Sequence, residues 1–121
     1  MILSLSMSDI QDITAKIRKF RDERDWLQFH NHKDVALSLV LEAAEVLEHF
    51  QWKSADEVKA HAQANKEELS DELADVAIYL LELADNIGID LSKAIETKMK
   101  KNAIKYPIEK AKGKHTKYNK L

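Results

Sequence analysis

The stretches LEAAEVLEHFQW (residues 41–52) and EELSDELADVAIYL (residues 67–80) decide the fold, because each places carboxylates inside a segment patterned as helix core. Glu42 and Glu45 lie three residues apart, and the second stretch repeats that spacing with its own acidic pair. Residues three or four positions apart share one face of an α-helix. Two such pairs on neighbouring helices would bring four carboxylates together, where they repel one another unless a cation lies between them.

The composition favours a single all-α domain. The chain has 121 residues with one Pro and two Gly, so turn and strand signals are few. Without Cys it forms neither a disulfide nor a thiolate metal site, which agrees with a cytoplasmic protein. No apolar run approaches the ~18 residues of a membrane span, and the start MILSLSMSD lacks the features of a signal peptide. We therefore expect an ordinary N-terminus, a cytoplasmic location and no membrane association.

Charge is unevenly distributed along the chain. Residues 1–97 hold 10 basic and 20 acidic side chains, a net charge of −10, whereas residues 98–121 hold nine Lys and one Glu, a net charge of +8. Such a basic segment is typical of a nucleic-acid-binding tail, of a cation source for an anionic ligand, or of a solvated tail that offsets an acidic body. The charge pattern leaves these three interpretations open.

Hydrophobic periodicity predicts four long helices and one short one. The predicted spans are residues 9–25, 34–51, 54–64, 65–87 and 90–106. Three pairs match the capping box that starts a helix: Ser8 with Gln11, Ser54 with Glu57, and Asn65 with Glu68. Gly88 and Pro107 are stop signals. The architecture we expect resembles a four-helix bundle with a short, peripheral extra helix between the second and third helices.

Apolar residues wrap nearly all of the predicted helix over residues 34–51, so this helix should be central. Its one consistent polar stripe consists of Ser38, Glu42, Glu45 and His49. The helix over residues 65–87 carries a polar line beside its apolar seam: Glu68, Glu72, Asp75, Tyr79, Glu82 and Asn86. Beyond Pro107 the segment IEKAKGKHTKYNKL has few apolar residues, and we expect it to be extended or mobile. We therefore divide the chain into a domain over residues 1–108 and a basic tail over residues 109–121.

The four carboxylates Glu42, Glu45, Glu72 and Asp75 form an all-oxygen set that suits a hard cation, Mg²⁺ or Mn²⁺. A single acidic pair is more often a solvated helix face, but the helix over residues 34–51 offers almost no other polar surface, and the spacing is repeated. A di-iron site needs two Glu-x-x-His motifs. Neither acidic stretch contains one, so the pattern favours Mg²⁺, which in proteins commonly serves a phosphate-bearing substrate.

Other side chains could complete a nucleotide site. The chain has no glycine-rich phosphate loop, so the negative charge of the phosphates would be neutralised by the metal and by side chains. The helix predicted over residues 90–106 offers Lys98, Lys101, Asn102 and Lys105. Aromatic residues that could stack on a base are Trp26, Phe29 and Trp52. The loop over residues 24–34 loses helical periodicity while keeping its aromatic residues. It either covers the core or lines a pocket, and periodicity does not decide between the two.

The set of motifs resembles the MazG-like, all-α nucleoside triphosphate pyrophosphohydrolases, and within them the dCTP pyrophosphatase branch. The family signature is ExxE, a spacer, then ExxD; here it is Glu42-x-x-Glu45, 26 residues, then Glu72-x-x-Asp75. The segments ERDWLQFH, EHFQWKS, EELSD, DVAIYL and KMKKNAIKYP are also similar to that branch. The likeness covers residues 10–107, with a weaker echo in KHTKYNKL.

The resemblance implies hydrolysis of a (d)NTP, dCTP or a related pyrimidine nucleotide, to (d)NMP and pyrophosphate, as nucleotide-pool house-cleaning. It implies that Glu42, Glu45, Glu72 and Asp75 hold Mg²⁺, and that one of them or Glu68 orients the water. It further implies that Trp26 and Trp52 enclose the base. The groups implied near sugar and phosphates are Tyr79, Lys98 and Asn102, with Lys105 and Tyr106 as a basic-aromatic pair. Members pair subunits, so a homodimer or a tetramer built of dimers is expected.

Two departures qualify this resemblance. The animal dCTP pyrophosphatases carry a His in the first helix where this chain has Ile17, which puts cytosine preference in doubt without affecting the metal ligands. In EELSDELAD, Glu68 and Asp71 also fit ExxD, although the following DVAIYL favours Glu72 and Asp75.

Two other classes of function remain as alternatives. A non-catalytic helical interaction module would bind a basic partner through its acidic face, and Glu45→Gln would leave its function intact. A nucleic-acid-binding protein would use the lysine-rich C-terminus, and its binding would depend steeply on salt. We regard nucleic acid as the less favoured partner.

Overall fold

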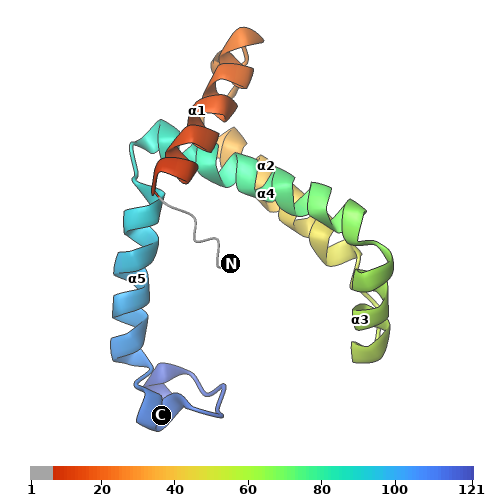
Figure 1. Cartoon of the computed structure of the whole chain (residues 1–121), viewed down its shortest axis with the longest axis vertical. Coiled ribbons are helices and arrows are strands. Elements are labelled where there is room, and N and C mark those ends of the chain that lie inside the picture. Colours follow the sequence, from red (N-terminus) through yellow and green to blue (C-terminus); the bar gives the residue numbers. More distant parts are fainter. Residues whose placement is uncertain (1–6) are drawn as a thin grey trace. The chain divides into compact units, whose positions relative to one another are not determined.

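The structure is a computed structural model that describes residues 7–121 (Figure 1). Over that range it holds six α-helices, two short 3₁₀ helices and no strand, so the all-α prediction is confirmed. The elements are α1 (Met7–Glu23), η1 (Leu27–Phe29), α2 (His32–Glu48), α3 (Ala55–Ala64), α4 (Lys66–Ile87), α5 (Leu91–Lys105), α6 (Ile108–Ala111) and η2 (Tyr118–Lys120). No helix within these residues has the length and apolar character needed to cross a membrane.

The chain divides into two compact units between Ile89 and Asp90. In the first unit α4 is the central element: it packs most extensively against α2 and also contacts α1 and α3. Helix α4 ends at Gly88, which adopts φ 83° and whose N–H donates to the carbonyls of Ala84 and Asp85. Glycine adopts this left-handed conformation without a Cβ clash. The functional boundary expected at residue 108 stays a prediction.

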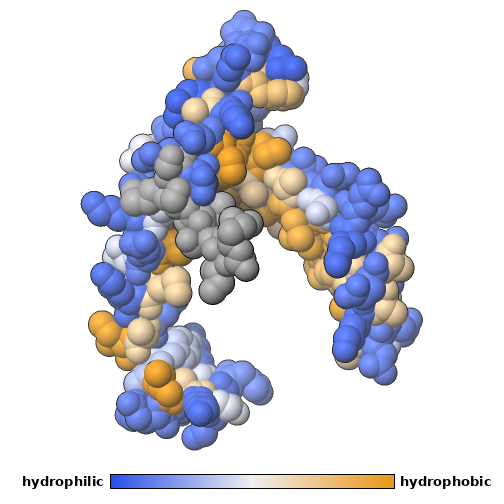
Figure 2. All heavy atoms as spheres, viewed as in Figure 1, coloured by the Kyte–Doolittle hydropathy of each residue, from blue (hydrophilic) through white to orange (hydrophobic). Residues whose placement is uncertain are grey.

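Only a small part of the apolar surface is buried within the first unit. Among the described residues, the buried apolar side chains are Val35, Leu69 and Ala84. Large apolar residues of α2 remain exposed, among them Val40 and Leu47 at 63% and 61%. Figure 2 shows apolar side chains gathered over the α2–α4 pair. The two helices thus bury a few apolar side chains where they touch and leave much of their other apolar surface exposed to solvent.

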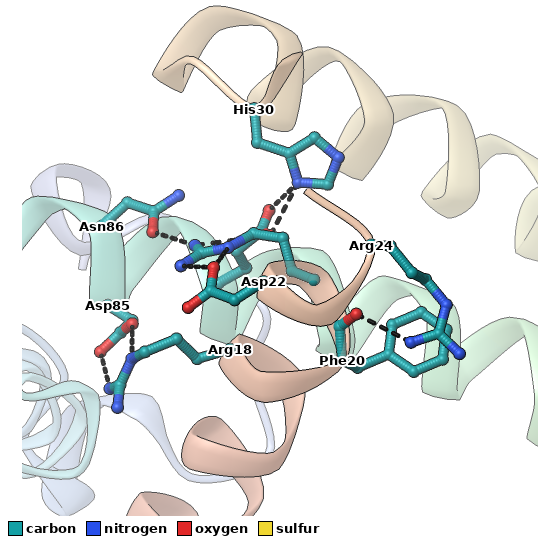
Figure 3. A network of polar contacts seen from close by, with 9 residues as sticks. Arg18, Phe20, Asp22, Arg24, His30, Asp85 and Asn86 are labelled. Atoms are coloured by element: carbon teal, nitrogen blue, oxygen red, sulfur yellow. Dashed lines mark hydrogen bonds and ion pairs between the residues drawn. The ribbon is translucent and has the colours of Figure 1, made fainter. Parts of the chain in front are cut away.

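Polar contacts, rather than an apolar seam alone, join α1 to α4. Arg21 and Glu82 are 5% and 4% exposed, and Arg21 Nη1 donates to Asn86 Oδ1 over 2.8 Å. His30 Nδ1 donates to Glu82 Oε1 over 2.8 Å, so the loop before α2 is tied to the same network (Figure 3).

An exposed ion pair lies farther along the α1–α4 contact. Arg18 donates to Asp85 through Nε at 2.9 Å and Nη2 at 2.6 Å (Figure 3). This bidentate geometry lowers the pKa of the Asp85 carboxyl, first through the hydrogen bond and then, against the opposing effect of burial, through the positive charge of Arg18.

Of the three predicted capping boxes, the structure shows the one at Ser54 and not the one at Asn65, and it places Ser8 inside a helix. The Ser54–Glu57 capping box is present, and α3 has the predicted end at Ala64. Asn65 precedes α4 but its side chain makes no capping hydrogen bond; it donates instead to the His61 carbonyl oxygen over 3.0 Å. Asp90, where the helix over residues 90–106 was predicted to begin, is the N-cap of α5, since its side chain accepts from the Lys93 N–H.

Several predicted boundaries are shifted. The helix predicted over residues 34–51 runs from His32 to Glu48, because Asn31 caps it early by accepting from the Asp34 N–H. The helix predicted over residues 9–25 begins at Met7, which places Ser8 inside it, and ends at Glu23. What precedes it lies outside the described residues, as does most of the MILSLSMSD start.

The second unit corrects the expectation for the C-terminal segment, which is not simply extended. α6 forms one helical turn after Pro107, and η2 follows near the end of the chain. The rings of Tyr106 and Tyr118 meet edge to face with centroids 6.1 Å apart, and Lys105 Nζ lies 4.8 Å from the Tyr118 ring centroid. Aromatic and cation–π contacts therefore order a segment whose composition suggested no packing.

Candidate functional site

The acidic pairs of α2 and α4 meet at the contact between these helices. The pKa of Glu42 is raised, first by burial and then by the negative charges of Glu45 and Asp75. A side-chain hydrogen bond with Glu45 and the charge of Glu72 raise it further. The four residues predicted to act together are thus close enough to perturb one another, and they form the candidate functional site, here called the carboxylate cluster.

Two oxygens of the carboxylate cluster are buried and lack a hydrogen bond: Oε2 of Glu42 and Oε2 of Glu72. Glu72 Oε2 does lie 2.5 Å from His49 Nε2, but the two atoms are not aligned as a hydrogen bond. Buried carboxylate oxygens ordinarily have partners, and an orphaned one costs about 1–3 kcal/mol or more. These two atoms therefore have unused capacity to bind a donor or a cation.

The four side chains offer carboxylate oxygens alone, and such a ligand set suits hard cations better than metals that prefer nitrogen or sulfur ligands. In the described part of the chain, however, no group of three or more His, Asp or Glu side chains converges closely enough to hold an ion. Glu68 is not among the groups whose charge raises the Glu42 pKa. An ion would thus bind to this cluster only after its side chains change position.

Tyr79 adjoins the carboxylate cluster on α4. Its pKa is raised, mainly by burial and then by the negative charges of Glu42, Glu82 and Asp75, while a hydrogen bond with Ser38 acts in the opposite direction. The phenol therefore stays protonated and can donate a hydrogen bond beside the carboxylates. The predicted polar line of α4 lies next to the predicted polar stripe of α2.

Of the two tryptophans predicted to enclose a base, Trp52 has an unusual backbone conformation, and Trp26 directly follows a residue that has one. Trp52 is 92% exposed and has φ 64°, a left-handed conformation that side chains with a Cβ rarely adopt. Asp25, directly before Trp26, has φ 54°. Trp26 itself is 42% exposed, and its ring lies edge to face against Phe20. The aromatic residues between α1 and α2 are thus neither wholly core nor wholly surface.

The basic and amide side chains predicted near the phosphates belong to the second unit, which is described by itself. Lys98 lines an open hollow on α5 together with Asp90, Lys93 and Lys101. Asn102 and Lys105 follow on the same helix, and Lys105 lies over the Tyr118 ring. Their approach to the carboxylate cluster stays a prediction.

Two groups of polar residues escaped sequence reasoning. Sequence spacing places Glu82 in the polar line of residues 65–87, but it does not indicate that Glu82 joins Arg21 and His30 in one network. His61 was assigned to a peripheral helix, yet its Nε2 lies 2.7 Å from Nδ1 of His49. No sequence pattern pairs residues twelve positions apart on different helices.

The chain is similar in sequence to a known protein family and to curated proteins. The chain matches the MazG-like family over residues 37–121. It is 41% identical to dCTP pyrophosphatase 1 of Rattus norvegicus over 114 residues, which cover 93% of this chain and 67% of that protein. The Homo sapiens dCTP pyrophosphatase 1 is 39% identical over 114 residues, with the same two coverages.

A solved structure is similar as well. A crystal structure of a pyrophosphatase from Archaeoglobus fulgidus superimposes with a TM-score of 0.76 at 43% identity, covering 88% of this chain and 99% of that one. The family resemblance read from the motifs is confirmed by these matches. The chain belongs to the MazG-like family and is a homologue of nucleoside triphosphate pyrophosphatases.

Proposed function

We propose that this protein is a Mg²⁺-dependent pyrophosphohydrolase that converts a dNTP, with dCTP or a related pyrimidine nucleotide as substrate, to dNMP and pyrophosphate. The observation that carries the proposal is the carboxylate cluster, in which half-buried Glu42 adjoins three other acidic side chains and has one buried oxygen without a partner. A fold does not retain such repulsion for stability, because removing the charges would relieve it. Clearing unwanted nucleotides from the pool is the role we infer for the activity.

Glu42, Glu45, Glu72 and Asp75 are the residues that would hold the cation. Bound Mg²⁺ would neutralise the phosphate oxygens and lower the pKa of a water molecule, so that this water becomes a nucleophile at neutral pH. Mn²⁺ has the same preference for oxygen ligands and is expected to substitute for it. The raised pKa of Glu42 in the metal-free protein agrees with a site that is completed by positive charge.

The reaction follows from these side chains. The water oxygen forms a bond to the α-phosphorus, and the bond from that phosphorus to the oxygen bridging the α and β phosphates breaks. A carboxylate of the cluster, or Glu68 on α4, accepts the proton of the water, and pyrophosphate leaves. Tyr79 can donate a hydrogen bond to the substrate from beside the cluster.

Substrate contacts are assigned to the aromatic and basic residues. Trp52 is almost fully exposed and available to stack on a base, and Trp26 is partly exposed beside His30. Lys98 and Asn102 on α5 would meet the phosphates, with Lys105 as a further cation. Ile17 stands where the animal dCTP pyrophosphatases carry a His, so the base preference of this chain need not be the same as theirs.

The test is an incubation of the purified protein with a panel of dNTPs and Mg²⁺, followed by product identification. Pyrophosphate and dNMP are expected, and both should vanish when EDTA removes the cation. Release of dNDP and phosphate, or no turnover of any nucleotide, would overturn the proposal. The nucleotide turned over fastest identifies the base.

A matched pair of variants on α2 links the activity to the carboxylate cluster. Glu45→Gln should lower kcat/KM by on the order of 100-fold or more, because several kcal/mol of charge stabilisation are lost. Glu48→Gln removes an exposed carboxylate of the same helix outside the cluster and should leave kcat/KM unchanged. Equal activity of the two variants would contradict the assignment and favour the interaction-module alternative.

A further inference from the structure

A chain of polar contacts leads from the end of α3 to the carboxylate cluster. Asn65 Nδ2 lies 3.2 Å from His61 Nδ1, and His61 Nε2 lies 2.7 Å from His49 Nδ1. The last link joins His49 Nε2 to Glu72 Oε2 at 2.5 Å. The chain therefore connects three helical segments through the turn after α2, and it ends on a residue assigned to the cation.

Asn65 fixes the direction in which hydrogen bonds are donated along this chain of contacts. Asn65 Nδ2 also donates to the His61 carbonyl oxygen, which accepts only, so the Asn65 atom facing His61 is the amide nitrogen. His61 Nδ1 must then accept, which leaves the proton on Nε2. That proton is donated to His49 Nδ1, so His49 in turn carries its proton on Nε2 and presents it to Glu72.

The surroundings hold the two histidines in place. His49 is 12% exposed, and its ring centroid lies 5.0 Å from that of His61. Phe50 meets the His61 ring edge to face at 6.3 Å. The Ser54–Glu57 capping box fixes the start of α3, and Asn65 ties down its end. The short helix that the sequence marked as peripheral thus serves as a rigid mount for His61.

We propose that the Asn65–His61–His49 chain makes His49 a positioning residue, which presents a fixed N–H to Glu72 and so orients this carboxylate toward the cation. The inference rests on the proposed function, because it assumes that Glu72 binds the cation. Glu72 Oε2 lies against His49 Nε2 without an aligned hydrogen bond, so the contact restricts where the carboxylate can turn while leaving it free to bind a metal. Partners that orient metal ligands in this way change affinity by about 10- to 100-fold when removed.

The test measures Mn²⁺ affinity of the full-length protein by electron paramagnetic resonance of the free ion, without substrate. His49→Leu should weaken Mn²⁺ binding by about 10- to 100-fold. His49→Gln should restore much of the affinity, since its amide nitrogen occupies the place of Nε2, whereas His49→Asn, which reaches only the place of Nδ1, should not. His115→Leu, an exposed histidine in the second unit, is the control and should bind Mn²⁺ like wild type.

The outcomes separate this inference from the function on which it rests. Wild-type protein that hydrolyses dNTPs, together with a His49→Leu variant whose Mn²⁺ affinity is within twofold of wild type, overturns the positioning role and leaves the function standing. Wild-type protein that neither binds Mn²⁺ nor hydrolyses any dNTP overturns both. If His49→Leu does not fold, His61→Leu takes its place, because it frees the His49 ring without removing it. Unchanged Mn²⁺ affinity in a folded His61→Leu protein would equally overturn the proposal that the Asn65–His61–His49 contacts position Glu72.

Discussion

At the scale of single residues, the repulsion in the carboxylate cluster is a cost that only a ligand would offset. Glu42 carries most of it, since burial and three neighbouring carboxylates all disfavour its charged form. A neutral side chain of the same shape avoids that cost while losing one ligand. Stability and cation binding should therefore respond to the same substitution in opposite directions.

We predict that Glu42→Gln stabilises the metal-free protein at neutral pH. Because the folded-state pKa of Glu42 is raised, wild type keeps its full stability below the ordinary glutamate pKa of about 4.3 and loses part of it as pH rises through the raised value. The variant should thus match wild type near pH 4 and exceed it by about 1 kcal/mol at pH 7. Urea unfolding in EDTA measures the difference, and a constant offset at all pH values would contradict it.

Trp52 allows strain and binding to be separated. Its left-handed conformation costs about 1–2 kcal/mol, and glycine would adopt it freely. Trp52→Gly should leave the free energy of unfolding unchanged or raise it by up to about 1 kcal/mol, yet raise KM by about 5- to 150-fold through the lost stacking of about 1–3 kcal/mol. Trp52→Ala is the control: it should raise KM equally without the gain in stability. An unaltered KM in both variants would remove Trp52 from the binding site.

At the scale of helices, periodicity and turn chemistry found the elements but not all of their partners. The spacing of the acidic pairs correctly predicted that α2 and α4 pack with their polar lines together, because a helix face follows directly from sequence spacing. Asn65 was misassigned as a cap, since the same residue type can bond the preceding helix instead. The reach of the α5 lysines toward the cluster depends on tertiary arrangement, which local spacing does not contain.

The α1–α4 contact offers a comparison between a buried and an exposed ionic partner. Glu82→Ala would leave buried Arg21 with the Asp22 carboxylate but without Glu82, and would remove the acceptor of His30 Nδ1. It should lower the free energy of unfolding by about 1–3 kcal/mol. Arg18→Ala, the matched change at the exposed pair with Asp85, should cost less than about 1 kcal/mol. Urea unfolding at pH 7 measures both, and equal losses would contradict the network's role.

The exposed pair should also respond to pH in a defined direction. Arg18 lowers the pKa of Asp85, so the pair contributes stability above the ordinary aspartate pKa of about 3.9 and loses it as pH falls through the lowered value. The difference between Arg18→Ala and wild type should accordingly shrink in strong acid.

At the scale of the whole molecule, the apolar surface exceeds what one chain covers. Val40 and Leu47 stand seven residues apart on α2, on the side of the helix away from Glu42 and Glu45, and both are mostly exposed. Exposed apolar faces of this kind mark interaction sites. Because the expected homodimer or dimer of dimers would cover such a face, assembly and catalysis should be separable by substitution on opposite sides of one helix.

We predict that the protein sediments as a dimer or tetramer of its 13.9 kDa chain, and that Leu47→Lys shifts it toward monomer. The buried lysine would have to lose its hydration in the interface, a cost that association cannot offset without a paired anion. The control is Glu48→Lys, which introduces the same residue at the next, exposed position and should sediment as wild type. Analytical ultracentrifugation over a range of concentrations measures both variants. A wild-type chain that stays monomeric at all concentrations, or a Leu47→Lys assembly of unchanged size, would show that this face of α2 is not the contact between subunits.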